Sequence, residues 1–237
     1  GQGVDVGAME MTKWFDTNYH YIVPEFSASQ DFSLSSTKIF DEYAEAKALG
    51  IQTRPVLVGP LTFLLLGKMK EKHADRLSLL PKLLPVYAQV LEKLADMGAE
   101  WVQMDEPCLA TDLTQAQQTA LTTIYQTLNQ GKTPKILLAT YFEALRDNLG
   151  VAASAPVAGL HIDCVRAPQQ LGAVLDALPE GKVLSLGVVD GRNIWRADLQ
   201  AAHAILQKAV DKLGSSRVFA APSCSLLHTP VDVAAET

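Results

Sequence analysis

Short apolar runs alternate with helical patterns along most of this chain, and this alternation limits the possible folds more than any other feature. The runs predicted to be buried strands are residues 54–60, 101–104, 135–140, 159–163, 183–189 and 217–221. Runs this short and this continuously apolar are typical of parallel strands covered on both faces. The pattern therefore predicts an α/β protein built from about six successive βα units.

The segments between these runs carry helix signals. Thr114 and Gln117 have the spacing of a capping box. Gly50, Gly98 and Gly214 each follow an apolar helical pattern and are expected to end a helix. No linker or low-complexity run divides the chain, so residues 1–237 are expected to form one domain. Periodicity alone leaves two architectures open, an open doubly wound sheet and most of a (βα)8 barrel.

Composition excludes several classes of protein. Hydrophobic residues make up 48% of the chain and charged residues 19%, as in an ordinary packed globule. The net charge of -6 argues against a general nucleic-acid binder. The chain contains neither a Gly-x-Gly-x-x-Gly motif after a first strand nor a Walker loop, which disfavours a nucleotide-binding fold.

The three cysteines are widely spaced and form no CxxC pair, so a cytoplasmic location is expected. Because the first residue is Gly1, we expect the chain to begin inside a longer gene product.

Aromatic and polar side chains are interleaved in residues 9–26. The aromatic residues are Trp14, Phe15, Tyr19, Tyr21 and Phe26. Together with neighbours such as Lys13 and Asn18 they could form the wall of a ligand site, with apolar faces and polar handles. The alternative is an irregular segment whose aromatic rings close one end of the core.

Polar residues gather where the predicted strands end. Asp105 and Glu106 follow the strand at 101–104, and Pro107 must stop that strand because it has no N–H to donate. Asp163 and Asp190 end two later strands. Ligands of α/β folds bind beyond the carboxyl ends of parallel strands, so we expect a binding site at this edge.

The polar residues near the strand ends also suggest a metal site or a cysteine nucleophile, but the sequence supports these two hypotheses less well. His161 and Asp163 lie two apart on one strand, and Cys224 or His228 could join them as zinc ligands. No HxxxH or CxxC spacing supports this set. A core histidine with satisfied hydrogen bonds and an unreactive thiol are favoured instead.

Five stretches resemble the family of cobalamin-independent methionine synthases, the 5-methyltetrahydropteroyltriglutamate–homocysteine methyltransferases. They run in order along nearly the whole chain: MEMTKWFDTNYHY (9–21), PVLVGP (55–60), QMDEP (103–107), VDGRNIW (189–195) and SCSLLH (223–228). The resemblance implies two (βα)8 barrels in the parent protein. This chain resembles the N-terminal barrel without its first strands, with residues 1–30 as an aromatic-rich segment and residues 31–237 as successive βα units. An incomplete TIM-type barrel is therefore expected.

The resemblance also assigns roles to residues. Lys13 and Asn18 match positions that bind the polyglutamate tail of the folate. The zinc-ligand positions of the C-terminal barrel fall on Ala139, Tyr141, Asp163 and Cys224 of this chain. Since Ala139 and Tyr141 do not ligate zinc as the family does, Asp163 and Cys224 are expected to be remnants of a duplicated metal site, and this chain is expected to hold no catalytic residue, cofactor or metal.

The resemblance implies that zinc in the C-terminal barrel binds homocysteine as a thiolate, which attacks the methyl group of 5-methyltetrahydropteroyltriglutamate. This chain would bind the folate tail and dock the catalytic barrel, with no nucleic-acid or membrane partner, and the isolated chain would be an inactive part of a methyltransferase. Two alternatives remain. One is a stand-alone folate- or anion-binding module, and the other is an independent metal-dependent barrel enzyme using His161, Asp163 and Cys224.

Overall fold

A single parallel sheet organises the computed structural model, which describes residues 9–232 and residue 234. Its six strands lie in the spatial order β10-β9-β8-β7-β6-β4, and every neighbouring pair is parallel. The strands are β4 (Val56–Val58), β6 (Trp101–Asp105), β7 (Lys135–Ala139), β8 (Gly159–Asp163), β9 (Val183–Val189) and β10 (Val218–Pro222). The prediction of a parallel α/β fold is confirmed.

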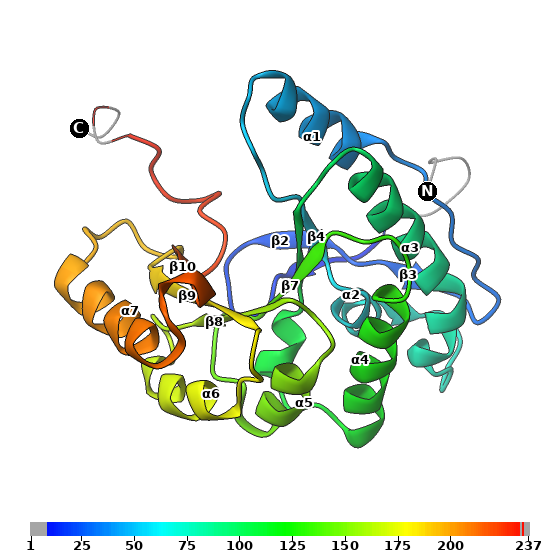
Figure 1. The fold of residues 1–237 in the computed structure, drawn as a ribbon. Coiled ribbons are helices and arrows are strands. Elements are labelled where there is room, and N and C mark those ends of the chain that lie inside the picture. The colour runs from blue at the N-terminus through cyan, green and yellow to red at the C-terminus, as the bar shows by residue number, and fades with distance from the viewer. Residues whose placement is uncertain (1–8, 233, 235–237) are drawn as a thin grey trace.

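Helices occupy the connections between the strands, and α3 to α7 form an arc around one side of the sheet (Figure 1). The α-helices are α1 (Lys38–Ala48), α2 (Pro60–Leu66), α3 (Leu80–Asp96), α4 (Gln115–Leu128), α5 (Leu149–Ser154), α6 (Leu171–Ala177) and α7 (Leu199–Leu213). Short 3-10 helices span Arg76–Leu79, Pro107–Ala110, Arg146–Asn148, Pro168–Gln170 and Ser215–Arg217.

The helix signals of the sequence act as expected. The Thr114 side chain accepts a hydrogen bond from the backbone N–H of Gln117, whose own side chain accepts from the N–H of Thr114, so the capping box begins α4. Gly50, Gly98 and Gly214 have φ angles of 74°, 89° and 83° and follow α1, α3 and α7. Residues with a side chain rarely adopt this conformation, so glycine is suited to these helix ends.

The core lies between the sheet and its helices. Val102 and Met104 on β6 are fully buried, as are Leu91 on α3 and Leu121 on α4, and all four belong to one apolar cluster. Because side chains alternate across a strand, the intervening residues of β6, such as Gln103, project from the opposite face.

The sheet is open within the described part of the chain. β4 and β10 are its two ends, and no pairing joins them in residues 9–232. Val56 and Val58 on β4 have exposed fractions of 52% and 38%, so apolar side chains of this end strand face solvent. Barrel closure is not seen, and whether the sheet belongs to a barrel of eight units remains a prediction.

Two small sheets complete the fold, and the sequence pattern predicts neither of them. β1 (Met11–Lys13) and β2 (His20–Ile22) form an antiparallel hairpin. β3 (Glu25–Phe26) pairs in parallel with β5 (Lys68–Met69). The aromatic-rich segment is therefore a hairpin followed by a short strand, not an irregular plug.

Candidate functional site at the carboxyl edge of the sheet

The aromatic segment forms a tight hairpin whose tip spans residues 14–19. The backbone N–H of Trp14 donates to the carbonyl of Tyr19 at 2.7 Å. Both the N–H and the hydroxyl of Thr17 donate to the carbonyl of Trp14, at 3.1 and 2.6 Å. Phe15 has a φ of 51°, a backbone angle that residues other than glycine seldom adopt. The tip is thus closed by its own hydrogen bonds.

The tip of this hairpin contacts loops that follow four successive strands of the sheet. Phe15 lies 6.0 Å from Phe142, measured between ring centroids, in the loop after β7. Asp16 pairs with arginines in the loops after β8 and β9. Tyr19 stacks on His228 after β10, with ring centroids 3.6 Å apart. The hairpin therefore lies over the carboxyl edge of the sheet, where α/β folds carry their ligand sites.

The two residues expected to bind the folate tail are neighbours in the structure. The Nζ of Lys13 donates to the Oδ1 of Asn18 at 3.3 Å, and both side chains are exposed. In the hairpin register Lys13 pairs with His20. Asn18 therefore orients the ammonium group while leaving it open to an anion. That the two residues contact is now observed, whereas their role in binding remains a prediction.

Two cavities flank the tip of the hairpin. The first, of about 270 Å³, is walled by aromatic rings of the hairpin and by residues after β7 and β10: Trp14, Tyr19, Tyr21, Tyr141, Phe142 and His228, among others. The second, of about 420 Å³, is lined by Phe15, Asp16, Phe142 and Arg166, with Ala110, Thr111 and Glu143. Phe142 lines both cavities. The interleaved aromatic residues therefore do contribute to hollows at the expected edge.

The two carboxylates at the end of β6 have different surroundings. Asp105 accepts from the side-chain amide of Gln103 at 2.7 Å and from the hydroxyl of Tyr141 at 3.0 Å. Burial raises the pKa of Asp105 to about 6, and the hydrogen bonds from Gln103 and Tyr141 oppose part of this rise. Asp105 therefore titrates nearer neutrality than an ordinary aspartate.

Glu106 is not displayed at the strand end as the sequence suggests. Its side chain is fully buried and accepts from the backbone N–H groups of Leu61 and Thr62, at 3.1 and 2.7 Å, and from the hydroxyl of Tyr125 at 3.2 Å. Burial raises the pKa of Glu106, and these donors lower it in part. Glu106 thus anchors the first turn of α2 to β6, which is a structural task.

The positions that correspond to zinc ligands do not fit a metal. The Oδ2 of Asp163 accepts from the N–H of Phe142, and its Oδ1 accepts from the N–H groups of Val165 and Arg166, all within 3.0 Å. Ala139 offers no donor atom, and Tyr141 donates to Asp105. Burial raises the pKa of the Cys224 thiol to about 11, which disfavours the thiolate that zinc requires. No group of three or more potential metal-ligating side chains gathers within the part of the chain that the structure describes.

His161 has partners of its own in the core. Its Nδ1 lies 2.9 Å from the Ser185 hydroxyl, and its Nε2 lies 3.3 Å from the carbonyl of Ser223. Burial lowers its pKa to about 4, so the ring is neutral at physiological pH. These contacts agree with the favoured reading of a satisfied core histidine.

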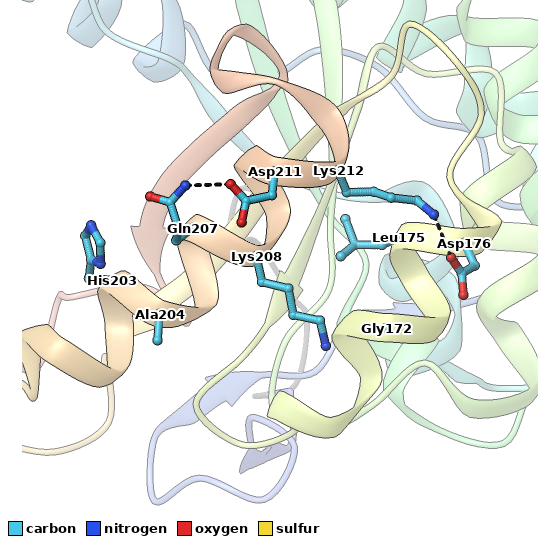
Figure 2. Close-up of a pocket in the computed structure, with 9 residues that line it drawn as sticks. All are labelled: Gly172, Leu175, Asp176, His203, Ala204, Gln207, Lys208, Asp211 and Lys212. Atoms are coloured by element: carbon cyan, nitrogen blue, oxygen red, sulfur yellow. Dashed lines mark hydrogen bonds and ion pairs between the residues drawn. The ribbon is translucent and has the colours of Figure 1, made fainter.

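Another surface hollow lies away from this edge, between α6 and α7 (Figure 2). This groove measures about 790 Å³. Four of its polar side chains form two pairs, since Lys212 lies 3.2 Å from Asp176 and Gln207 donates to Asp211 at 2.7 Å. A groove between adjacent outer helices with internally paired charges is ordinary helix packing. It is not our candidate site.

Known proteins match both the fold and the sequence. A B12-independent methionine synthase from Shewanella sp. W3-18-1 superposes with a TM-score of 0.74 over 92% of this chain and 67% of its own, at 15% sequence identity. At this identity the likeness establishes the fold alone, a parallel α/β fold of the methionine synthase type. In the described residues, no helix combines the length and apolarity needed to cross a membrane.

Sequence comparison then identifies the family. Residues 1–214 match the model of the cobalamin-independent synthase N-terminal domain, and the chain belongs to this family. A 5-methyltetrahydropteroyltriglutamate–homocysteine methyltransferase from Nitrobacter winogradskyi is 59% identical over 231 residues, covering 97% of this chain and 30% of the relative. One from Salinibacter ruber is 55% identical over 237 residues, covering 100% of this chain and 31% of the relative. The chain thus spans about a third of the length of these curated relatives.

Sequence reasoning missed the residues that hold the hairpin in place. Asp16 appears in the sequence only as one polar residue among aromatics, and Arg192 only as part of a loop after a strand. Their partnership joins positions 176 residues apart. No local pattern signals such a contact, although two arginines directly after strand ends could have been noted as available cations.

Proposed function

We propose that this chain is the N-terminal part of a methyltransferase that moves a methyl group from 5-methyltetrahydropteroyltriglutamate to homocysteine, forming methionine. Membership of the cobalamin-independent synthase family and the names of relatives 55–59% identical support this reading. The three cysteines are free thiols in the structure. A reducing compartment suits free thiols, and we place the protein in the cytoplasm on that ground.

In this proposal residues 1–237 form one domain, a section of a (βα)8 barrel. Two features of the sheet support it. In the described residues no strand pairs with the outer edge of β4 or of β10, and the β4 side chains Val56 and Val58 are exposed. Strands from elsewhere in the parent protein would pair with these edges and cover the valines. Exposed edges are usually paired or covered in native proteins.

The role assigned to this chain is to bind the polyglutamate tail of the folate. The observation that carries the assignment is the contact between Lys13 and Asn18 on a hairpin lying over the carboxyl edge of the sheet. A polyglutamate tail carries several carboxylates. Lys13 supplies a positive charge and Asn18 a directional amide donor, and these are the groups that a carboxylate requires.

The chemical step is assigned to the C-terminal domain of the parent protein, which would hold zinc and homocysteine and dock on this chain. The poor fit of Ala139, Tyr141, Asp163 and Cys224 to a metal supports placing zinc there. We accordingly propose that the isolated chain has no methyltransferase activity. An independent metal-dependent barrel enzyme using His161, Asp163 and Cys224 is disfavoured. Neighbouring groups engage the donor atoms of His161 and Asp163, and burial raises the pKa of the Cys224 thiol to about 11.

Replacing Lys13 in the intact enzyme tests the proposal. Lys13→Ala removes the charge that attracts the tail, so the KM for 5-methyltetrahydropteroyltriglutamate should rise about tenfold, the equivalent of losing one hydrogen bond to a charged group. Both kcat and zinc content should stay near the wild-type values. Steady-state kinetics and elemental analysis measure these quantities.

Lys208→Ala provides a matched control, since Lys208 lies on α7 in the groove of Figure 2, away from the hairpin. It should leave the KM unchanged. An unaltered KM in Lys13→Ala would remove Lys13 from the folate site.

A further inference from the structure

One carboxylate at the tip of the hairpin is held by two arginines. The Nη1 of Arg192 lies 3.1 Å from both carboxylate oxygens of Asp16, and its Nη2 donates to the Asp16 carbonyl at 3.3 Å. The Nη2 of Arg166 donates to the Oδ2 of Asp16, also at 3.3 Å. Charge-assisted contacts with several hydrogen bonds fix geometry better than a single surface ion pair.

The two arginines are themselves fixed by the loop after β7. The guanidinium of Arg192 lies over the ring of Phe142, 5.2 Å from its centroid. The Nε of Arg166 donates to the carbonyl of Phe142 at 3.4 Å. Phe142 in turn packs against Phe15, the neighbour of Asp16. Asp16 is therefore the centre of a set of contacts that joins the hairpin to the loops after β7, β8 and β9.

The backbone is strained on both sides of this set. Phe15 has a φ of 51° and Phe142 a φ of 82°, and neither is glycine. Such conformations cost about 1–3 kcal/mol each and persist where the surroundings enforce them, often at functional sites. The ion pairs of Asp16 and the packing of the Phe15 ring against the Phe142 ring hold the backbone in these conformations.

We propose that Asp16, held by Arg166 and Arg192, is a positioning residue that fixes the hairpin over the carboxyl edge and so presents Lys13 and Asn18 to the folate tail. This inference rests on the function proposed above. Asp16 lies between Lys13 and Asn18 in the turn, so a shift of Asp16 moves both. Asp16 does not itself contact the tail, because its charge has the same sign as the tail carboxylates.

The test uses Asp16→Asn in the intact enzyme, which removes the charge and keeps the shape. The KM for 5-methyltetrahydropteroyltriglutamate should rise about fivefold to tenfold, a typical coupling between residues in contact, while kcat and zinc content hold. Amide hydrogen exchange in residues 11–22 should quicken as the hairpin loosens. Asp16→Glu, which retains the charge, should recover part of the affinity.

A double-mutant cycle separates positioning from a general structural effect. If Asp16 acts by placing Lys13 and Asn18, Asp16→Asn should raise the KM less in the Lys13→Ala background than in the wild type, because only the contact of Asn18 remains to be lost. Asp176→Asn, which breaks an exposed pair with Lys212 in the groove of Figure 2, is the control and should change neither KM nor exchange in residues 11–22.

The outcomes also distinguish the two proposals. A KM that rises in Lys13→Ala but not in Asp16→Asn contradicts the positioning role and leaves the tail-binding role intact. Equal effects of Asp16→Asn with and without Lys13 contradict it as well. If Lys13→Ala has no effect on KM, the tail-binding function fails. In that case, an unchanged rate of amide hydrogen exchange in residues 11–22 of Asp16→Asn would show that Asp16 does not fix the hairpin.

Discussion

Asp105 and Glu106 are adjacent in the sequence, yet their side chains serve different sides of the sheet. Asp105 accepts a hydrogen bond from Tyr141, whereas Glu106 turns toward α2 and Tyr125. Alternation along a strand sends neighbouring side chains to opposite faces. The sequence shows two carboxylates at the end of β6, but only the packing of α2 and α4 decides that Glu106 is buried.

The raised pKa of Asp105 implies that the stability of the fold depends on pH. Its pKa is about 6 in the folded protein and 3.8 in the absence of the fold. The folded state therefore binds the proton of the Asp105 carboxyl group more tightly than the unfolded state does. The stabilisation that this proton gives the fold is complete below pH 4 and is lost as the pH rises through 6. Asp105→Asn, which cannot ionise, should gain about 1–3 kcal/mol relative to the wild type between pH 4 and pH 7. Urea unfolding of both proteins across this range measures it, and a constant difference would contradict the assignment.

At the scale of elements, predictability follows the strength of the local pattern. The strands Gly159–Asp163 and Val183–Val189 have the predicted bounds, because each is a short, mostly apolar run. Helix α2, by contrast, is apolar on all sides and begins directly after β4, so it shows no amphipathic period. The three-residue strands β1 and β2 are too short to display alternation. Tertiary contacts, not local pattern, create these elements.

The junction of β4 and α2 depends on Gly59. A Cβ at this position would lie 2.1 Å from the Cδ of the buried Glu106. Gly59→Ala should therefore force Glu106 away from the N–H groups that it caps, and lower the free energy of unfolding by about 2–4 kcal/mol. Gly172→Ala in α6 is the control, since nothing lies within 4 Å of its added Cβ. Thermal unfolding should show a lower Tm only for Gly59→Ala, and equal Tm values would refute the close contact.

At the scale of the whole molecule, the candidate site depends on segments far apart in the chain. The hairpin near the start meets loops after β7, β8, β9 and β10, so residues such as Asp16 and Arg192 become neighbours only when the sheet has formed. The edge of the sheet that carries the site was predictable, because parallel strands place their carboxyl ends together. The residues that hold the hairpin there were not, since each contact spans more than a hundred positions.

The central claim is that this hairpin binds the folate tail, and competition by tri-γ-glutamate tests it most directly. This peptide carries the carboxylates of the tail without the pterin or the methyl group, so it isolates the contact assigned to Lys13. We predict that it inhibits the intact wild-type enzyme competitively against 5-methyltetrahydropteroyltriglutamate, and that Lys13→Ala raises its inhibition constant about tenfold, the equivalent of about 1.4 kcal/mol. The same inhibition constant in both proteins would contradict the account.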